Sequence, residues 1–310
     1  MNVLWVKDNN IGHEKQVDVL LKELSKKLNL KIDSRIVKNS FLFQKKIDNV
    51  KSNYYDILIG AGHKTHSILL KNKKNQKKTT KVIAILSPTF YKSKFDIICT
   101  PSQDKHKFNS KDNVIFYEGS LVTVSLKETR EDVVMIAIGG KNKHYIFDQD
   151  HIYDQMEYFL SINSNKHCYI FNSRRTPREI SKKISSQYKD NERITFVDFY
   201  DNRSNISIEE IMHQSQSKLI TRDSVNMVYE SLSCKGDTYL FDMHVKRGSN
   251  KVVENINMLI KNRKIGYVDC SELTKGFSKM KLEKQNIHND VFAEVEKVAY
   301  EIQNLSLIHI

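Results

Sequence analysis

The segment that decides the fold is Leu219-Ile220-Thr221-Arg222-Asp223-Ser224-Val225-Asn226-Met227-Val228-Tyr229-Glu230. Its apolar run ends at Thr221, and apolar residues then recur at the spacing of a helix (Val225, Val228 and Leu232). Asp223 or Ser224 can cap this helix, because a side-chain oxygen there accepts from first-turn amides. The segment therefore predicts a strand that leads straight into a helix.

Such a junction is typical of an anion site, because free amides and the helix dipole both point at the ligand. Arg222 adds a forked donor suited to phosphate or carboxylate, and Glu230 follows two turns into the helix. Two related turns come earlier in the same half: Gly139-Gly140-Lys141 and Ser173-Arg174-Arg175-Thr176-Pro177. We expect all three to converge at one edge of a parallel sheet, where open α/β sheets bind ligands. The alternative interpretation of the two consecutive arginines is an ordinary surface pair.

Length and composition indicate a folded protein of about two domains. No apolar run approaches the roughly 20 residues of a membrane-spanning helix. The N-terminus, Met1–Asp8, predicts a first strand and not a signal peptide, so we expect a cytoplasmic protein. The four cysteines have neither zinc-finger nor thioredoxin-like spacing, which predicts buried free thiols (Cys99, Cys168, Cys234 and Cys270).

The net charge of +13 suits phosphorylated ligands, nucleic acid or an anionic membrane face. The densest basic run is Lys71–Lys78, which is either a solvated connection or a contact with a membrane or acidic partner. No nucleic-acid-binding signature accompanies the charge, so nucleic acid is the weakest of these partners.

Apolar runs alternate with amphipathic helices along most of the chain, which predicts parallel sheets flanked by helices. The first helix is expected over about 13–30 and the last over about 290–304. A polar stretch at 118–132 separates two repeats of the same plan. We therefore expect an α/β fold with two Rossmann-like, doubly wound domains facing across a cleft. Their expected bounds are 1–125, joined by the C-terminal helix 290–305, and 131–285.

The first domain contributes two turns with chemical potential. The first strand ends at Asp8, and Gly12 permits a tight turn before His13 at the start of a helix. A helix N-terminus favours the neutral imidazole, which suits a general base; the alternative is that His13 only caps or packs. The second turn holds Gly60 and Gly62, which allow close approach to a ligand, followed by donors that open the next helix (His63, Lys64 and Thr65).

Metal binding is not predicted. His63 and His66 have no partners at a convincing spacing. Asp148 and Asp150 resemble an Asp-x-Asp metal motif only superficially, and we expect them to introduce the helix that follows.

Taken together, these motifs resemble the Elm (elongated-mitochondria) family over roughly Leu4–Asp269. The matching stretches begin with Gly12-His13-Glu14-Lys15-Gln16, Gly60-Ala61-Gly62-His63-Lys64-Thr65-His66 and Phe95-Asp96-Ile97-Ile98. They continue with Asn113-Val114-Ile115 and Gly119-Ser120-Leu121. Most specific are Ser173-Arg174-Arg175-Thr176-Pro177 and Thr221–Glu230. The resemblance implies a scaffold like that of GT-B glycosyltransferases, with donor nucleotide in the second domain, acceptor in the first, and no metal or other cofactor.

The function implied is transfer of a sugar from a nucleotide-sugar to a surface polysaccharide or lipid-linked acceptor, in the cytoplasm or at the inner face of a membrane. His13, with His63 in reserve, would deprotonate the acceptor beside a loop that includes Asp8, Gly12, Gly60, Gly62 and Lys64. The expected donor-binding residues are Gly139, Gly140, Ser173, Arg174, Arg175, Thr176, Arg222, Asp223, Ser224 and Glu230. Two alternatives remain open: a non-enzymatic adaptor at a membrane, as the plant members' role in mitochondrial fission suggests, and a nucleotide-sugar epimerase.

Overall fold

The computed structural model describes residues 1–39, 45–47, 54–109, 112–201, 204–246, 248, 250–271, 280–284 and 291–306. The chain forms two compact units. Unit 1 comprises Met1–Thr123 and Ala293–Ile310, and unit 2 comprises Val124–Phe292. Within the described part, no helix combines the length and apolar character needed to cross a bilayer.

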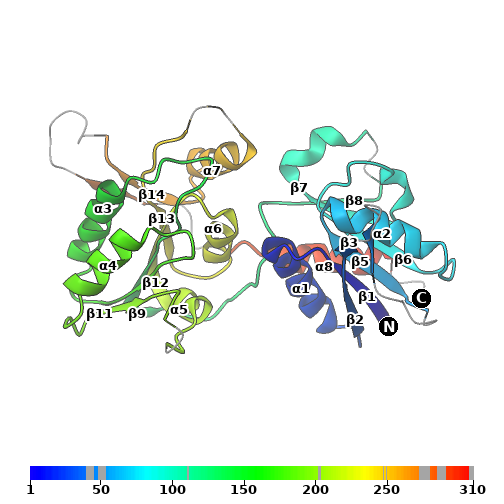
Figure 1. The fold of residues 1–310 in the computed structure, drawn as a ribbon, viewed down its shortest axis with the longest axis horizontal. Helices are drawn as coiled ribbons and strands as arrows, with labels where there is room; N and C mark the ends of the chain where they lie inside the picture. Colours follow the sequence, from blue (N-terminus) through cyan, green and yellow to red (C-terminus); the bar gives the residue numbers. More distant parts are fainter. Residues whose placement is uncertain are drawn as a thin grey trace. The chain divides into compact units, whose positions relative to one another are not determined.

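Unit 1 is built on a six-stranded parallel sheet in the order β2-β1-β5-β6-β7-β8 (Figure 1). Its strands are β1 (Asn2–Lys7), β2 (Lys31–Ile36), β5 (Ile57–Ala61), β6 (Lys81–Ile85), β7 (Ile97–Pro101) and β8 (Val114–Tyr117). The central strands are buried along their length because helices cover both faces, as parallel sheets require. A separate two-residue pair joins β3 (Lys38–Asn39) to β4 (Lys45–Lys46).

Helix α2 (His63–Lys73) covers one face of this sheet, where Ile68 and Leu69 pack against Leu4, Val6 and Leu58. Helices α1 (Ile11–Ser25) and α8 (Glu294–Ser306) lie beside each other and contact strands of the same sheet (dark blue and red in Figure 1). The short 3-10 helices η1 (Lys92–Lys94) and η2 (Ser102–Lys107) flank β7.

Unit 2 repeats the plan with a seven-stranded sheet in the order β11-β10-β9-β12-β13-β14-β15. The parallel strands are β9 (Arg130–Ala137), β10 (His167–Phe171), β11 (Ile194–Val197), β12 (Ser215–Ile220), β13 (Asp237–Leu240) and β14 (Gly266–Asp269). The edge strand β15 (Lys281–Glu283) is antiparallel. Both units thus have the predicted Rossmann-like parallel architecture.

The helices of unit 2 are α3 (Gln149–Ile162), α4 (Arg178–Gln187), α5 (Ile208–Gln214), α6 (Val225–Leu232) and α7 (Lys251–Lys261). Apolar residues of α3, α4 and α7 form the large core on one face of the sheet. On strands β9 and β12, alternate residues face the other way, toward α5 and α6. As predicted, all four cysteines are buried free thiols, and Asp148 caps α3.

The largest differences from the predicted helix bounds are at the end of the first helix and the start of the last. The first helix ends at Ser25 and not near Leu30, because the chain must turn in time for β2 to pair with the whole length of β1. The last helix begins at Glu294. Phe292, inside the predicted range, is bonded through its backbone to Leu232 and Ser233 and not to the helix. The predicted start at residue 290 lies outside the described residues.

Lys218 on β12 is the least expected core residue of unit 2. Its side chain is fully buried. Its ammonium group donates to the carbonyl oxygens of Ser231 at 2.9 Å and Lys235 at 2.7 Å. Burial lowers the pKa of Lys218, but these carbonyls at the C-terminal end of α6 compensate the charge. The contact fixes α6 onto the strand that precedes it.

We expect Lys218→Met to lower the free energy of unfolding by about 3 kcal/mol, because it leaves buried carbonyls without a donor. Urea denaturation of the full chain measures the effect. Lys235→Met is the matched control, since it removes only a partly exposed ion pair with Glu128 and should cost less than about 1 kcal/mol. Equal costs for the two variants would contradict the role assigned to Lys218.

Candidate functional site

Each sheet reverses its strand order at one point, and there the carboxyl ends of two neighbouring strands diverge to form a crevice. In unit 1 this point lies between β1 and β5, and in unit 2 between β9 and β12. Four of the turns singled out in the sequence follow these strands, after Lys7, Ala61, Ala137 and Ile220. The fifth, Ser173–Pro177, follows β10, the neighbour of β9. The topology thus brings the predicted residues together in two groups, one in each unit.

In unit 1, Asp8 and His13 form a dyad. The Nδ1 atom of His13 lies 2.9 Å from Oδ2 of Asp8, whose side chain is only 5% exposed. The second carboxylate oxygen accepts from the Asn10 amide at 3.0 Å, which fixes its orientation. In the neutral imidazole, the proton therefore sits on Nδ1 facing the carboxylate, and Nε2 is left as a proton acceptor. This is the arrangement of a general base held by a carboxylate.

The turn before His13 differs from the prediction. Gly12 was expected to supply a tight turn, but it lies inside the first turn of α1. The left-handed residue is Asn9, with φ of 61°, and Asn10 caps the helix by accepting from the amides of Gly12 and His13. Asn9 and Asn10 can replace glycine because asparagine tolerates the left-handed region and accepts from nearby amides. An Asn directly before a helical pattern is the signal that sequence reasoning missed.

Gly62, in the turn after β5, lies against the Asp8–His13 dyad. It has φ of 82°, and a Cβ atom there would lie 2.6 Å from the His13 ring and 3.3 Å from Asp8. Gly60 is equally confined, since a Cβ atom would meet Thr65 and the Val6 carbonyl at 2.9 Å. The two glycines thus allow the turn after β5 to pack against the turn after β1.

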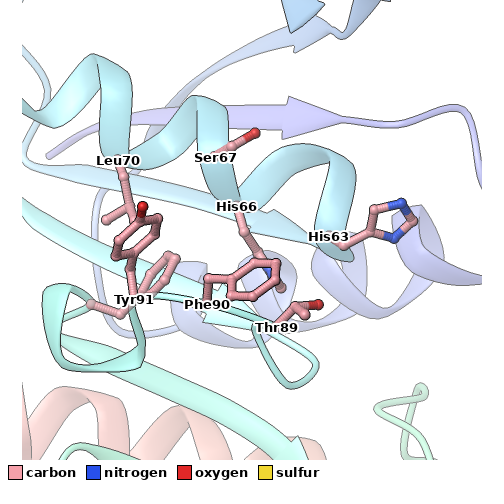
Figure 2. A pocket seen from close by; sticks show the side chains of 8 residues that line it. His63, His66, Ser67, Leu70, Thr89, Phe90 and Tyr91 are labelled. Atoms are coloured by element: carbon pink, nitrogen blue, oxygen red, sulfur yellow. The ribbon is translucent and has the colours of Figure 1, made fainter.

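The histidines of α2 have different environments (Figure 2). His63 and Lys64 are exposed in the first turn of the helix. His66 is buried, and its Nε2 lies 3.1 Å from the carbonyl oxygen of Ile85, so that nitrogen carries the proton. Desolvation lowers the pKa of His66 to about 4. His66 is therefore a neutral structural residue, and His63 is the histidine of α2 that a ligand can reach.

In unit 2, hydroxyl groups join the three predicted turns. The Gly139 amide donates to the Thr221 hydroxyl at 2.7 Å. Thr176 accepts from the Ser173 amide at 2.8 Å and donates to the Ile138 carbonyl at 2.9 Å. Thr176 thus holds its own turn closed against the turn after β9, and its hydroxyl is occupied within the protein.

Asp223 makes a contact that corrects its predicted role as a helix cap. Its buried carboxylate accepts from the Gly140 amide at 3.2 Å and pairs with Arg175 at 2.8 Å. Ser224 occupies the N-cap position of α6 but makes no cap hydrogen bond within the described structure. The first-turn amides of α6 are therefore left without the side-chain acceptor that was predicted.

Three of the described helices lack a side-chain cap at the N-terminus. In the described parts of the chain, α1, α3, α5 and α7 have side-chain caps, whereas α2, α4 and α6 have none. Helices α2 and α6 follow the strands β5 and β12 that border the two reversal points. An uncapped N-terminus leaves amide donors and a partial positive charge, which suit an anion.

The arginines of the second group divide into exposed and buried ones. Arg174 is exposed and the Arg175 side chain is 40% exposed. Arg222, predicted to donate to an anionic ligand, is buried. Its Nε donates to the Phe241 carbonyl at 2.7 Å, and its Nη2 lies 3.5 Å from Asp242. Glu230 is half-buried on α6.

Asp242 also lies 3.7 Å from His151 and raises the pKa of that histidine to about 10. With Cys270 these residues are the one group in the described chain able to hold a metal, with potential ligand atoms within 4.8 Å of one another. However, Arg222 and His151 already supply positive charge to the Asp242 carboxylate. This arrangement favours an ion-pair network over a metal site. The network was missed in the sequence because it joins residues from separate elements.

Known structures of the same architecture identify the scaffold. UDP-GlcNAc 2-epimerase from Methanocaldococcus jannaschii matches with a TM-score of 0.55 and 11% identity, covering 98% of this chain and 100% of that one. The UDP-GlcNAc-bound 2-epimerase from Neisseria meningitidis matches with a TM-score of 0.54 and 12% identity, covering 99% of this chain and 100% of that one. Escherichia coli ADP-heptose lipopolysaccharide heptosyltransferase II matches with a TM-score of 0.50 and 9% identity, covering 100% of this chain and 99% of that one. The chain therefore has the two-domain, GT-B-like scaffold shared by glycosyltransferases and epimerases.

The family follows from the sequence itself. The family described as mitochondrial fission ELM1 matches residues 11–305, and the chain belongs to it. Comparison with curated proteins gives no significant match.

His66 predicts a pH dependence of stability. The unfolded chain protonates this histidine near pH 6.5, whereas the folded chain does so only near pH 4. The unfolded state thus binds more protons between these values, and the free energy of unfolding should fall by up to about 3 kcal/mol as pH drops from 6.5 to 4.

Urea denaturation across this pH range measures the fall. His66→Gln keeps a donor toward the Ile85 carbonyl but does not titrate, so its stability should change less over the same range. Parallel curves for the two proteins would show that another group causes the pH dependence.

Proposed function

We propose that this protein is a metal-independent glycosyltransferase that moves a sugar from a nucleotide-sugar to a hydroxyl of a surface polysaccharide or lipid-linked acceptor. The observation that carries the proposal is the Asp8–His13 dyad at the strand-order reversal of unit 1, together with the uncapped α6 and exposed arginines at the reversal of unit 2. The first is suited to accept a proton, and the second to hold a diphosphate.

On the donor side, Arg174, Arg175 and Ser173 would bind the phosphates together with the first-turn amides of α6. Leaving-group charge develops on the diphosphate as its bond to the anomeric carbon breaks, and these donors would stabilise it without a divalent ion. Glu230 would accept from a ribose or sugar hydroxyl. The amides of Gly139 and Gly140 already donate to Thr221 and Asp223, so we assign these glycines, with Thr176 and Arg222, to shaping the turns.

On the acceptor side, Nε2 of His13 would take the proton from the hydroxyl as its oxygen attacks the anomeric carbon. Asp8 would stabilise the imidazolium that forms and keep the ring oriented. Gly60 and Gly62 would let their turn pack against the Asp8–His13 dyad, and Lys64 would add positive charge beside the acceptor. His63 would be the reserve base because it is the exposed histidine of the neighbouring turn.

A binding measurement tests the donor site and identifies the nucleotide. We expect calorimetry without added metal to detect one class among UDP-, GDP-, CMP- and ADP-sugars. Arg174→Ala should weaken that binding about tenfold, because a charge-assisted hydrogen bond to phosphate is lost. Arg193→Ala is the matched control: Arg193 directly precedes β11 and so lies at the opposite edge of the sheet. If the folded protein binds none of these nucleotide-sugars, the result would favour the non-enzymatic adaptor.

Steady-state kinetics test the role of His13 as the general base. With donor and acceptor identified, His13→Ala should lower kcat by about 10²- to 10⁴-fold while nucleotide binding is kept, and Asp8→Asn should lower it through loss of ring orientation. Activity should persist with EDTA. His106→Ala removes another exposed histidine of unit 1 and should leave kcat unchanged. Undiminished turnover in His13→Ala would refute the base assignment, and an epimerised nucleotide-sugar formed without acceptor would indicate an epimerase.

A further inference from the structure

The most exposed aromatic pair of unit 1 lies in the loop between β6 and η1. Phe90 is 72% exposed and Tyr91 is 66% exposed. Tyr91 has φ of 56°, a left-handed conformation that is strained for a tyrosine and that the loop nevertheless holds. Two adjacent aromatic rings exposed to water indicate a binding surface.

An apolar hollow of about 200 Å³ lies directly beneath this pair. One wall is α2, with His66 and Leu70, and the other is the loop that carries Phe90 and Tyr91 (Figure 2). Phe95 also lines the hollow and packs edge-to-face against His66 at 5.6 Å. The exposed rings are thus continuous with an apolar surface and are not isolated side chains.

Lysines surround this apolar surface. Lys71, Lys74 and Lys94 line a second hollow together with Tyr91. Lys92 lines a third beside Phe90. The Lys94 ammonium lies 4.7 Å from the centre of the Tyr91 ring. Among described residues, no carboxylate lies within ion-pair distance of these four lysines, and Asp112 is the one acidic residue that lines any of the three hollows.

A second exposed aromatic pair in the chain provides a contrast. Phe199 and Tyr200 are 55% and 51% exposed, but they lie between Asp198 and Asp201 in the sequence. The Tyr200 hydroxyl donates to the Arg174 carbonyl at 3.1 Å, and Arg178 lies 5.3 Å from its ring. This pair has partners within the protein. Phe90 and Tyr91 differ in the charge around them, because the four lysines have no carboxylate partner among the described residues. Lys92 donates to the Lys107 carbonyl, and Lys94 lies over the Tyr91 ring.

We propose that Phe90 and Tyr91 insert into the interface of a membrane that contains anionic phospholipid, while Lys71, Lys74, Lys92 and Lys94 contact the headgroups. Aromatic side chains favour the headgroup level of a bilayer, and lysines near an anionic surface are attracted to it. This binding goes beyond the proposed reaction, since it needs neither donor nor acceptor.

Vesicle binding tests the proposal on the full chain. We expect cosedimentation with phosphatidylcholine vesicles that contain phosphatidylglycerol, weakening as salt rises, and little with phosphatidylcholine alone. Phe90→Ala/Tyr91→Ala should weaken binding about tenfold or more, and Lys92→Glu/Lys94→Glu at least as much. Phe199→Ala/Tyr200→Ala is the matched control and should bind as the wild type does. All of these positions are exposed or partly exposed, so thermal melting should confirm that each variant is folded.

Phe90→Trp reports insertion directly, because the native Trp5 is buried. Its fluorescence should shift to the blue on anionic vesicles and be quenched by brominated acyl chains. Absence of binding to anionic vesicles, or equal binding by Phe90→Ala/Tyr91→Ala, would overturn the proposal. A concentration-dependent dimer that this double variant abolishes would overturn it in favour of a second copy of the chain.

Discussion

The interaction on which the candidate site of unit 2 depends is the buried carboxylate of Asp223. It bridges three turns from three strands, because it accepts from Gly140, pairs with Arg175 and belongs to the turn after β12. A carboxylate without exposed surface is costly unless it is hydrogen-bonded and paired, so the three turns are stable in this arrangement only together. Gly139 is required for the same reason, since a Cβ atom there would lie 2.1 Å from an oxygen of Asp223.

In unit 1 the turns at the strand-order reversal are also held together by side chains, but by different residues. Its two turns meet through Gly62 and the ring of His13, and the carboxylate that orients the ring comes from Asp8. In both units a glycine admits a functional side chain from the neighbouring strand end, and in both an acidic residue is held by a backbone amide. The parallel order of each sheet positions these contacts, because it places the two turns at adjacent strand ends.

Sequence patterns predicted the sheets well because the central strands are mostly apolar runs and the helices that cover them have apolar stripes. The last helix starts late because Phe292 bonds to Leu232, the last residue of α6, and to Ser233. The site was predicted less completely. Which turns converge follows from strand ends, but the partners of Arg222, Asp223 and Lys218 lie on other elements, so only tertiary packing determines them.

The internal bonds of these turns restrict where an anion can bind in unit 2. The Gly139 and Gly140 amides already have acceptors, and an anion placed on them would approach the Asp223 carboxylate and be repelled by it. Arg222 is committed to Phe241 and Asp242. The exposed cation of Arg174 and the uncapped amides of α6 carry no such conflict, and the partly exposed Arg175 has N–H donors beyond the one that pairs with Asp223. A diphosphate would therefore bind at the outer rim of the three turns, with Arg175 shared between Asp223 and the ligand, and the glycines would serve to keep that arginine in place.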